Sequence, residues 1–330
     1  MSSQNKGIMA LGHILVDGIG SASEALLARL GDLPSPAHIP PGDMEALCAF
    51  IRRGEGVGEM SWNLGGGVAI TAKAAIALGL KSEVWASVGR DRHGLFLARE
   101  LTKAGVVARL FESGKPTGVF CSFTIASGGK KIVVSPGAAR DIRGLDIPAG
   151  AFHPAWIFYV DGLLIDRPDW LIEQAIKAKK AGMAIAMDLS TPANARAHGV
   201  ELVEFAQEFC DIVFANEMEF DALGVLPERG AEAGTTWVVK KAGKGASALS
   251  GGRWIDAPVS ETEPIDDTGA GDTFSAGFLA AFIQGFDGAQ CLRFGNIAAA
   301  TALRCSGSNF DTAVMKREFD AQRLAYESIK

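Results

Sequence analysis

The 330-residue sequence has few cysteines, no excess of positive charge and no long apolar run, and each shortage excludes a class of protein. Its five cysteines stand singly, with no Cys-x-x-Cys pair, so neither a disulfide framework nor a zinc site is expected. The formal net charge is −6, and isolated Lys-Lys pairs such as 130–131 are too short to form a nucleic-acid-binding face. The chain begins without a signal-peptide apolar region, and no stretch approaches the ~20 apolar residues of a membrane span. A cytoplasmic protein that binds neither nucleic acid nor membrane is expected.

Short apolar strands alternate with helices through most of the chain. Strands are expected over 8–12, 83–88, 106–111, 117–125, 131–135, 156–160, 183–188, 211–215, 236–240, 246–250 and 253–256. Helices are expected near 44–52, after the glycines at 65–67 up to Gly79, and over 93–104, 168–181, 199–208, 272–285, 287–304 and 311–328. This alternation predicts an α/β fold with helices on both faces of a mostly parallel sheet.

Two regions depart from that alternation. Residues 20–60 include four prolines within eight positions, which interrupt regular structure and predict an excursion from the main sheet. The three strands expected within 106–135 have no helix between them, so they predict a small antiparallel sheet attached to the α/β body. We expect one domain over 1–330, with a β lid formed by segments within about 13–60 and 106–135.

Glycine-containing junctions stand at several places where a strand gives way to a loop or helix. They lie at 65–67, 161–162, 242–245 and 269–271. In an open α/β sheet, ligands bind at the carboxyl ends of the strands, where loops meet helix N-termini. Four such junctions in one chain indicate a ligand site.

The most informative junction reads D-D-T-G-A-G-D-T-F over 266–274. Small residues at 269–271 let backbone N–H groups approach a ligand, and a helix starting nearby adds the positive end of its dipole. This arrangement can bind an anion or a phosphoryl group in transfer. Asp272 has two interpretations here: a helix N-cap, which only stabilises the helix, or a general base that takes a proton from a substrate hydroxyl.

The order of motifs resembles that of the ribokinase-like (PfkB) carbohydrate kinase family. The similarity rests on D-D-T-G-A-G-D-T-F-S-A-G-F near the C-terminus and N-L-G-G-G-V-A-I-T-A followed by V-G-R-D-R-H-G near the N-terminus. Further segments agree in order, namely A-L-G-H-I-L-V-D, P-T-G, V-D-G, A-N-E-M-E-F and V-V-K-K-A-G-K-G-A. The resemblance implies a three-layer sandwich with a mostly parallel central sheet and a β-sheet lid. The proline-rich excursion is similar to that of adenosine-kinase-like members.

The resemblance also implies roles for individual residues. Asp272 matches the catalytic base, and Gly269, Ala270 and Gly271 match the anion hole. On the acceptor side, Asp17 matches the acid that hydrogen-bonds sugar hydroxyls, and the turn that brings backbone to the sugar is Gly65, Gly66 and Gly67.

On the nucleotide side, Lys240, Gly243 and Gly245 match the loop beside ATP, and Asn296 lies on the helix that borders the adenine pocket. Asn216 and Glu219 match the N-x-x-E motif that organises Mg²⁺, mainly through water; without the resemblance they read as an ordinary helix start. A monovalent cation such as K⁺ is implied for some members, at positions matched by Asp266, Thr268 and Ser308.

Four positions depart from the family pattern. Ile70 replaces an asparagine that contacts the sugar, Arg90 an acid, Ala242 a glycine, and Asp267 a small or hydroxyl residue. None removes the base or the anion hole, but they leave the choice of sugar or nucleoside open.

The expected function is ATP-dependent phosphorylation of a primary hydroxyl on a small sugar or nucleoside. The alternative is a kinase-fold protein that binds sugar or nucleotide with little or no turnover. A nicotinamide-dependent oxidoreductase and a P-loop kinase are disfavoured, because neither G-x-G-x-x-G after the first strand nor G-x-x-x-x-G-K-[ST] occurs. A homodimer through the lid and a monomer both stay open.

Overall fold

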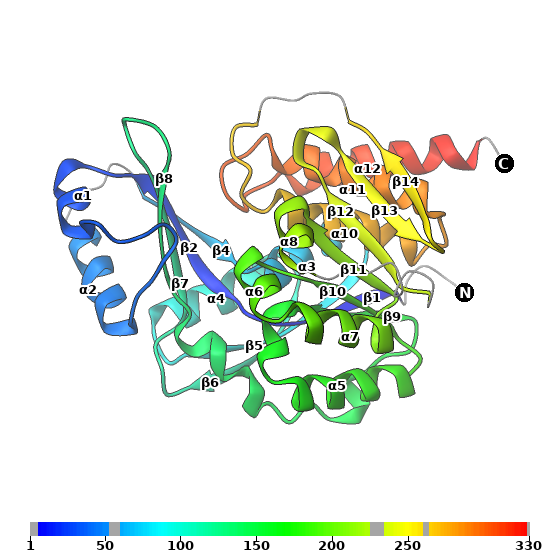
Figure 1. The fold of residues 1–330 in the computed structure, drawn as a ribbon, viewed down its shortest axis with the longest axis horizontal. Coiled ribbons are helices and arrows are strands. Elements are labelled where there is room, and N and C mark those ends of the chain that lie inside the picture. The colour runs from blue at the N-terminus through cyan, green and yellow to red at the C-terminus, as the bar shows by residue number, and fades with distance from the viewer. Residues whose placement is uncertain (1–5, 53–59, 225–233, 260–263, 329–330) are drawn as a thin grey trace.

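Two β-sheets organise the chain in the computed structural model, which describes residues 6–52, 60–224, 234–259 and 264–328 (Figure 1). The larger sheet has nine strands: β1 (Gly7–Leu11), β5 (Lys81–Gly89), β6 (Val107–Ser113), β9 (Trp156–Asp161), β10 (Ala184–Asp188), β11 (Ile212–Asn216), β12 (Thr236–Lys240), β13 (Ala246–Ser250) and β14 (Arg253–Ala257). Their order is β14-β13-β12-β11-β10-β9-β1-β5-β6, with all pairs parallel except β12–β13 and β13–β14. Strand β9, Trp-Ile-Phe-Tyr-Val-Asp, is buried throughout, as expected for a central parallel strand covered on both faces.

The smaller sheet forms the lid. Its five strands, in the order β3-β8-β7-β2-β4, are β3 (Ala37–His38), β8 (Lys130–Ser135), β7 (Val119–Thr124), β2 (Leu15–Ser21) and β4 (Ser61–Gly65). The lid is mixed rather than antiparallel, because β2 pairs parallel with β7 and β3 parallel with β8. Strands β2 and β4 were not expected from the sequence.

One expected lid strand belongs to the body instead. The segment expected over 106–111 is β6, which pairs parallel with β5 at the edge of the main sheet. The physical reason is the helix α4 (Arg92–Lys103) between these strands: a strand–helix–strand crossover returns the chain parallel to its start in the same sheet. The lid prediction over 106–135 was therefore too wide at its beginning.

Most of the other helices have bounds close to those expected. The helices at 24–30 and 192–197 were not expected, and the one at 217–222 was expected only through the helix-start interpretation of Asn216 and Glu219. The other helices are α1 (Glu24–Leu30), α2 (Pro41–Arg52), α3 (Gly67–Ala77), α5 (Pro168–Lys180), α6 (Pro192–Ala197), α7 (Gly199–Phe209), α8 (Glu217–Ala222), α10 (Ala270–Phe282), α11 (Gly288–Ala302) and α12 (Thr312–Glu327). Helices α3, α10, α11 and α12 pack on one another as one layer, and α5 and α7 pack together on the other side of the sheet (Figure 1). Within the described ranges, no helix combines the length and the apolar character that crossing a membrane requires.

Helices α10 and α11 approach each other closely through two glycines. A Cβ at Gly277 would lie 2.5 Å from the carbonyl oxygen of Phe294, and one at Gly295 would lie 2.7 Å from the ring of Phe274. Each glycine therefore makes room for the partner helix. Ring contacts from Phe274 and Phe294 to further aromatic side chains continue this packing into the core.

The lid has a core of its own on the face away from the main sheet. Side chains of α1 and α2 cover β7 and β8 there, in a cluster that includes Leu26, Leu47, Cys48, Cys121 and Phe123. The alternate residues of β2 and β7, among them Asp17 and Ile19, point to the opposite face. The lid therefore turns the face that carries Asp17 toward the body. A homodimer through the lid stays a prediction, and the face under α1 and α2 is already occupied by the chain itself.

Candidate active site

Four neighbouring parallel strands end in polar residues at one edge of the main sheet. Asp161 ends β9, Asp188 ends β10, Asn216 ends β11 and Lys240 ends β12, and the register pairs Asp161 with Asp188 and Asn216 with Lys240. The carboxyl edge of a parallel sheet is where α/β proteins bind ligands. The start of α10 reaches the same place, because Lys240 Nζ lies against Gly271.

The structure excludes one of the two interpretations of Asp272, that of a helix N-cap. The N-cap of α10 is Gly269, in the left-handed region at φ +78°, and no side chain of the described residues caps this helix. Asp272 is the third residue of the helix, so its carboxylate lies free of the capping role. Among the described residues, the backbone N–H groups of Gly271 and Asp272 have no acceptor, as is usual in a first helical turn. The turn at 269–271 therefore presents unpaired N–H groups beside a carboxylate.

Glycines in the turn at 65–67 bring the two key carboxylates close to backbone. A Cβ at Gly67 would lie 2.7 Å from Asp272 Oδ1, and a Cβ at Gly65 would overlap the carboxylate of Asp17. Gly66 has φ +88° and packs on the carbonyl oxygen of His13, where a side chain would clash. Glycine is required at this turn because lid, helix and base converge there.

Asp17 is a buried carboxylate without a hydrogen-bond partner among the described residues. Only 7 % of the residue is exposed, and none of the described hydrogen bonds or ion pairs uses it. Burial raises the pKa of Asp17 to about 8, and the negative charge of Asp272 adds to this effect. A buried polar group left unpaired is costly, so its presence indicates a ligand that supplies the missing hydrogen bonds.

Asp188 and Lys240 form a buried ion pair beside the turn at 269–271, which is called the anion turn below. Lys240 Nζ donates to Asp188 Oδ2 at 2.8 Å, and both side chains are largely buried. Burial opposes the charge of Lys240, yet the carboxylates of Asp188, Glu219 and Asp272 raise its pKa above the usual value. Lys240 thus stays a cation among three acids.

The pKa of Asp272 is set by the same surroundings. Desolvation and the negative charge of Asp188 raise the pKa of Asp272 to about 7, although the positive charge of Lys240 acts in the opposite sense. A carboxylate with a pKa near 7 is suited to accept a proton and release it again at neutral pH.

A second buried cluster lies at the junction between body and lid. His13, between β1 and β2, bonds Asp161 Oδ2 through Nδ1 at 2.7 Å and donates its backbone N–H to the same oxygen at 3.1 Å. Ser190 Oγ donates to Asp161 Oδ1 at 2.5 Å. Although burial opposes ionisation, the contacts with His13 and Ser190 hold the pKa of Asp161 below its usual range. Asp161 is therefore a fixed anion that ties the root of the lid to the sheet.

Two of the residues expected beside the nucleotide, Asn296 and Gly245, come together at Ala257. Asn296 Nδ2 donates to the carbonyl oxygen of Ala257 at 2.9 Å, and a Cβ at Gly245, which has φ +90°, would overlap that same oxygen. Gly243 is exposed, with open space where a side chain would be. Ala242 has φ +48°, a strained value for alanine and the reason a glycine is usual here.

Asn216 and Glu219 form a capping box at the start of α8. Asn216 Oδ1 accepts from the N–H of Glu219, and Glu219 Oε2 accepts from the N–H of Asn216, each at 2.8 Å. Burial and the nearby charge of Asp188 raise the pKa of Glu219 to about 7. The helix-start interpretation is thus structurally correct, while the oxygens keep further lone pairs toward the site.

The positions expected to bind a monovalent cation are only partly suited to it. Asp266 accepts from the N–H and hydroxyl of Thr268 and from the N–H of Gly307, which brings both loops together. Ser308 has its hydroxyl bonded to the carbonyl of Leu64, and its own carbonyl accepts from Lys73 Nζ at 2.5 Å. Ser308 is therefore already engaged, one contact being an ammonium group.

Comparisons with known proteins agree on the family. The model of the pfkB family carbohydrate kinases matches residues 48–314. The chain belongs to the pfkB family of carbohydrate kinases. It is 27% identical over 267 residues to a nucleoside kinase of Methanothermobacter thermautotrophicus, covering 78% of this chain and 85% of that protein. It is 29% identical over 253 residues to a ribokinase of Bacillus subtilis, covering 73% of this chain and 81% of that protein.

Solved structures show the same fold. An adenosine kinase from Sinorhizobium meliloti aligns with a TM-score of 0.80 at 24% identity, over 98% of this chain and 100% of that one. A ribokinase from Thermotoga maritima aligns with a TM-score of 0.71 at 21% identity, over 96% of this chain and 99% of that one. The pfkB fold of this chain is therefore the ribokinase-like α/β fold that its motifs implied.

Two departures from the pfkB motifs lie in different surroundings. Ile70 is buried and packs on Gly269, 3.3 Å from the position a Cβ would take, so it supports the anion turn. Arg90 is exposed and pairs with Glu112 of β6 at 2.6 Å. Neither Ile70 nor Arg90 has a described hydrogen bond or ion pair with Asp272.

Sequence reasoning missed several residues of this pfkB site. Asp161 and Asp188 each end an apolar strand, and that position is a usable signal in a parallel sheet. His13 and Lys130 carry no comparable signal, because their partners are distant in sequence.

Proposed function

We propose that this protein transfers the γ-phosphoryl group of ATP to a primary hydroxyl of a small sugar or nucleoside, with Asp272 as general base. The observation that carries the proposal is the placement of Asp272 itself. It is free of a capping role, sits beside unpaired N–H groups at a helix start, and has a pKa raised to about 7. A base, an anion-binding turn and a hydroxyl-binding carboxylate are the three parts that phosphoryl transfer to an alcohol needs.

The acceptor would lie between Asp17 and Asp272. Asp17 accepts hydrogen bonds from neighbouring hydroxyls, which satisfies its unpaired oxygens. The reacting hydroxyl then faces Asp272, which takes its proton as the oxygen forms a bond to the γ-phosphorus and the bond to the β-phosphate oxygen breaks. ADP leaves with that oxygen, and the proton on Asp272 passes to solvent. The N–H groups of Gly271 and Asp272 and the helix dipole stabilise the charge on the phosphoryl group in transfer.

The nucleotide would lie over the ends of β11 and β12. Lys240, held by Asp188, faces the turn from below and supplies positive charge near the phosphates. The oxygen atoms of Asn216 and Glu219 suit Mg²⁺ held through water, and such an ion would neutralise phosphate charge. The poor fit of Ser308 means that no step is assigned to K⁺.

The test replaces Asp272 with Asn, which keeps the shape and removes the base. We expect kcat to fall by about 10² to 10⁴, the usual contribution of a general base, with an unchanged melting temperature or a higher one. The assay is ATP-dependent phosphorylation over a panel of sugars and nucleosides. Near-normal turnover in Asp272→Asn would end the proposal. Binding of a panel member without any phosphorylation by the parent would favour the non-catalytic alternative.

A further inference from the structure

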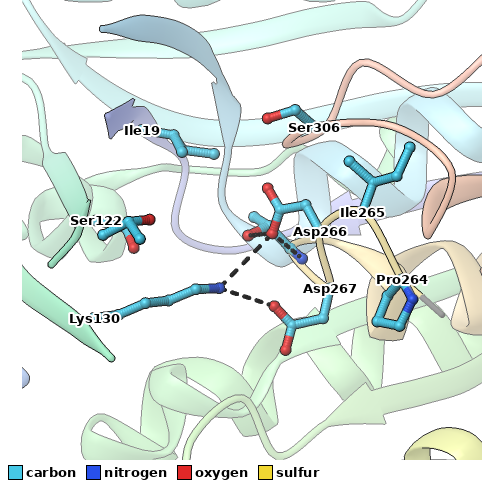
Figure 2. A pocket seen from close by; sticks show the side chains of 10 residues that line it. Ile19, Ser122, Lys130, Pro264, Ile265, Asp266, Asp267 and Ser306 are labelled. Carbon is cyan, nitrogen blue, oxygen red and sulfur yellow. Dashed lines mark hydrogen bonds and ion pairs between the residues drawn. The ribbon is translucent and has the colours of Figure 1, made fainter. Parts of the chain in front are cut away.

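A lysine of the lid reaches across to the loop that leads into the anion turn. Lys130, the first residue of β8, lies with Nζ 3.1 Å from Asp267 Oδ1 and 3.8 Å from Asp266 Oδ1 (Figure 2). These contacts span a cavity of about 350 Å³. Its walls come from two bodies: the lid contributes Ile19, Ser122, Thr124 and Lys130, and the main body contributes residues 264–268 and Ser306.

The two acids differ in how firmly they are held. Asp266 is fixed by the hydrogen bonds to Thr268 and Gly307, and although burial opposes it, these bonds hold its pKa below the usual range. Asp267 is 75 % exposed and its carboxylate pairs with Lys130 alone among the described residues. Its main-chain carbonyl accepts from the N–H of Ala270, inside the anion turn. The loop is thus anchored to the body, and the Asp267 side chain is free to meet the lid.

We propose that Lys130 is a positioning residue whose ion pair with Asp267 docks the lid on the body and so helps to hold the acceptor. The proposal rests on the proposed function, because the acceptor lies under the same lid face. It also explains why an acid stands at position 267, where the proposed catalytic groups require none. Lys130 is 47 % exposed, and an ion pair of this kind is weak and reversible. We therefore expect it to shift the closed fraction of the lid by about threefold to fivefold, which permits opening in each turnover.

The first measurement tests docking without turnover. A water-soluble carbodiimide activates a carboxylate, and an amine in contact displaces the activating group to form an amide. In the substrate-free protein we expect a zero-length cross-link between the peptides that carry Lys130 and Asp267. It should be lost in Lys130→Met, fall in Asp267→Asn to what the adjacent Asp266 still forms, weaken in 0.5 M salt because the pair is exposed, and persist in Lys131→Met. Lys131 is the matched control, since its Nζ bonds the carbonyls of Gly31 and Leu33 within the lid.

The second measurement tests whether docking serves the acceptor. An acceptor that needs a closed lid binds more weakly in proportion to the closed fraction. With D-ribose and adenosine as the acceptors tested, Lys130→Met and Asp267→Asn should each raise KM about threefold to fivefold with little change in kcat. The double variant should be no worse than either single one, and Lys130→Arg should restore the parent value.

The outcomes separate this inference from the proposed function. No cross-link in the parent protein, additive effects in the double variant, or an unchanged KM would each overturn it. If neither acceptor is phosphorylated, the proposed function fails for them, and the cross-link with its salt dependence decides alone whether the lid docks through Lys130.

Discussion

Replacing Asp17 with Asn should make the substrate-free protein more stable at neutral and alkaline pH while abolishing acceptor binding. Asp17 is buried and unpaired, and its pKa is raised from 3.8 to about 8. Between these two values the folded state keeps a proton that the unfolded state has lost. Folding stability therefore falls as pH rises from about 4 to about 8, and changes no further above that.

The size of the effect follows from the proton linkage. One bound proton corresponds to about 1.36 kcal/mol per pH unit, so Asp17 alone costs at most about 2.7 kcal/mol between pH 6 and pH 8. For a chain of this length, 1 kcal/mol corresponds to roughly 2 °C in melting temperature, so the parent should lose about 4 to 5 °C from this residue. Asp17→Asn has no such proton, so its melting temperature should fall by about 4 to 5 °C less than that of the parent between pH 6 and pH 8.

The assay is thermal unfolding of parent and variant at half-unit pH steps from 5.5 to 9, without substrate. The control is Asp43→Asn, because Asp43 is an exposed carboxylate on α2 of the same lid. Its melting temperatures should follow the parent at each pH. If the curves of Asp17→Asn and the parent run parallel from pH 6 to pH 8, the buried, unpaired state of Asp17 is refuted.

Two further changes test the surroundings of the base. The acid limb of the pH–rate profile should lie near pH 7, the pKa of Asp272. Asp188→Asn should move this limb down by about 1 pH unit, because the charge of Asp188 is the second cause of the raised pKa after desolvation. A limb that does not move would show that another group controls it. Gly67→Ala should lower kcat by about tenfold or more with a near-normal melting temperature, because the new methyl group would press on Asp272 Oδ1. An unchanged kcat would contradict the close approach of Gly67 and Asp272.

Much of the fold was predictable because periodicity and element length are local properties. The expected strands and helices of the body lie within two or three residues of those observed. The lid was harder, since β2 forms by pairing with β4 across the proline-rich segment and with β7, about 100 residues further along the chain. Strand β6 was placed in the lid because adjacency to β7 in sequence was given more weight than the crossover helix α4.

The candidate site was predictable only in part, for a physical reason. The glycine turns and Asp272 are adjacent in sequence and so form recognisable motifs. Asp188 acts by lying beside Lys240, 52 residues away, and Lys130 meets Asp267 across 137 residues. Such contacts depend on sheet register and on the position of the lid, which no local pattern encodes. The cap of α10 was likewise hidden, because it depends on the left-handed backbone of Gly269.

The interlocked glycines of α10 and α11 also decide which part of this enzyme is able to move. With Gly277 against the backbone of Phe294 and Gly295 against the ring of Phe274, neither helix has room to slide or rotate on the other. The proposed base Asp272 and the turn at 269–271 thus stand at the start of a tightly packed helix, where amide hydrogens should exchange slowly. If Asp272 is the base, we therefore expect motion during turnover in the lid and not in α10 and α11.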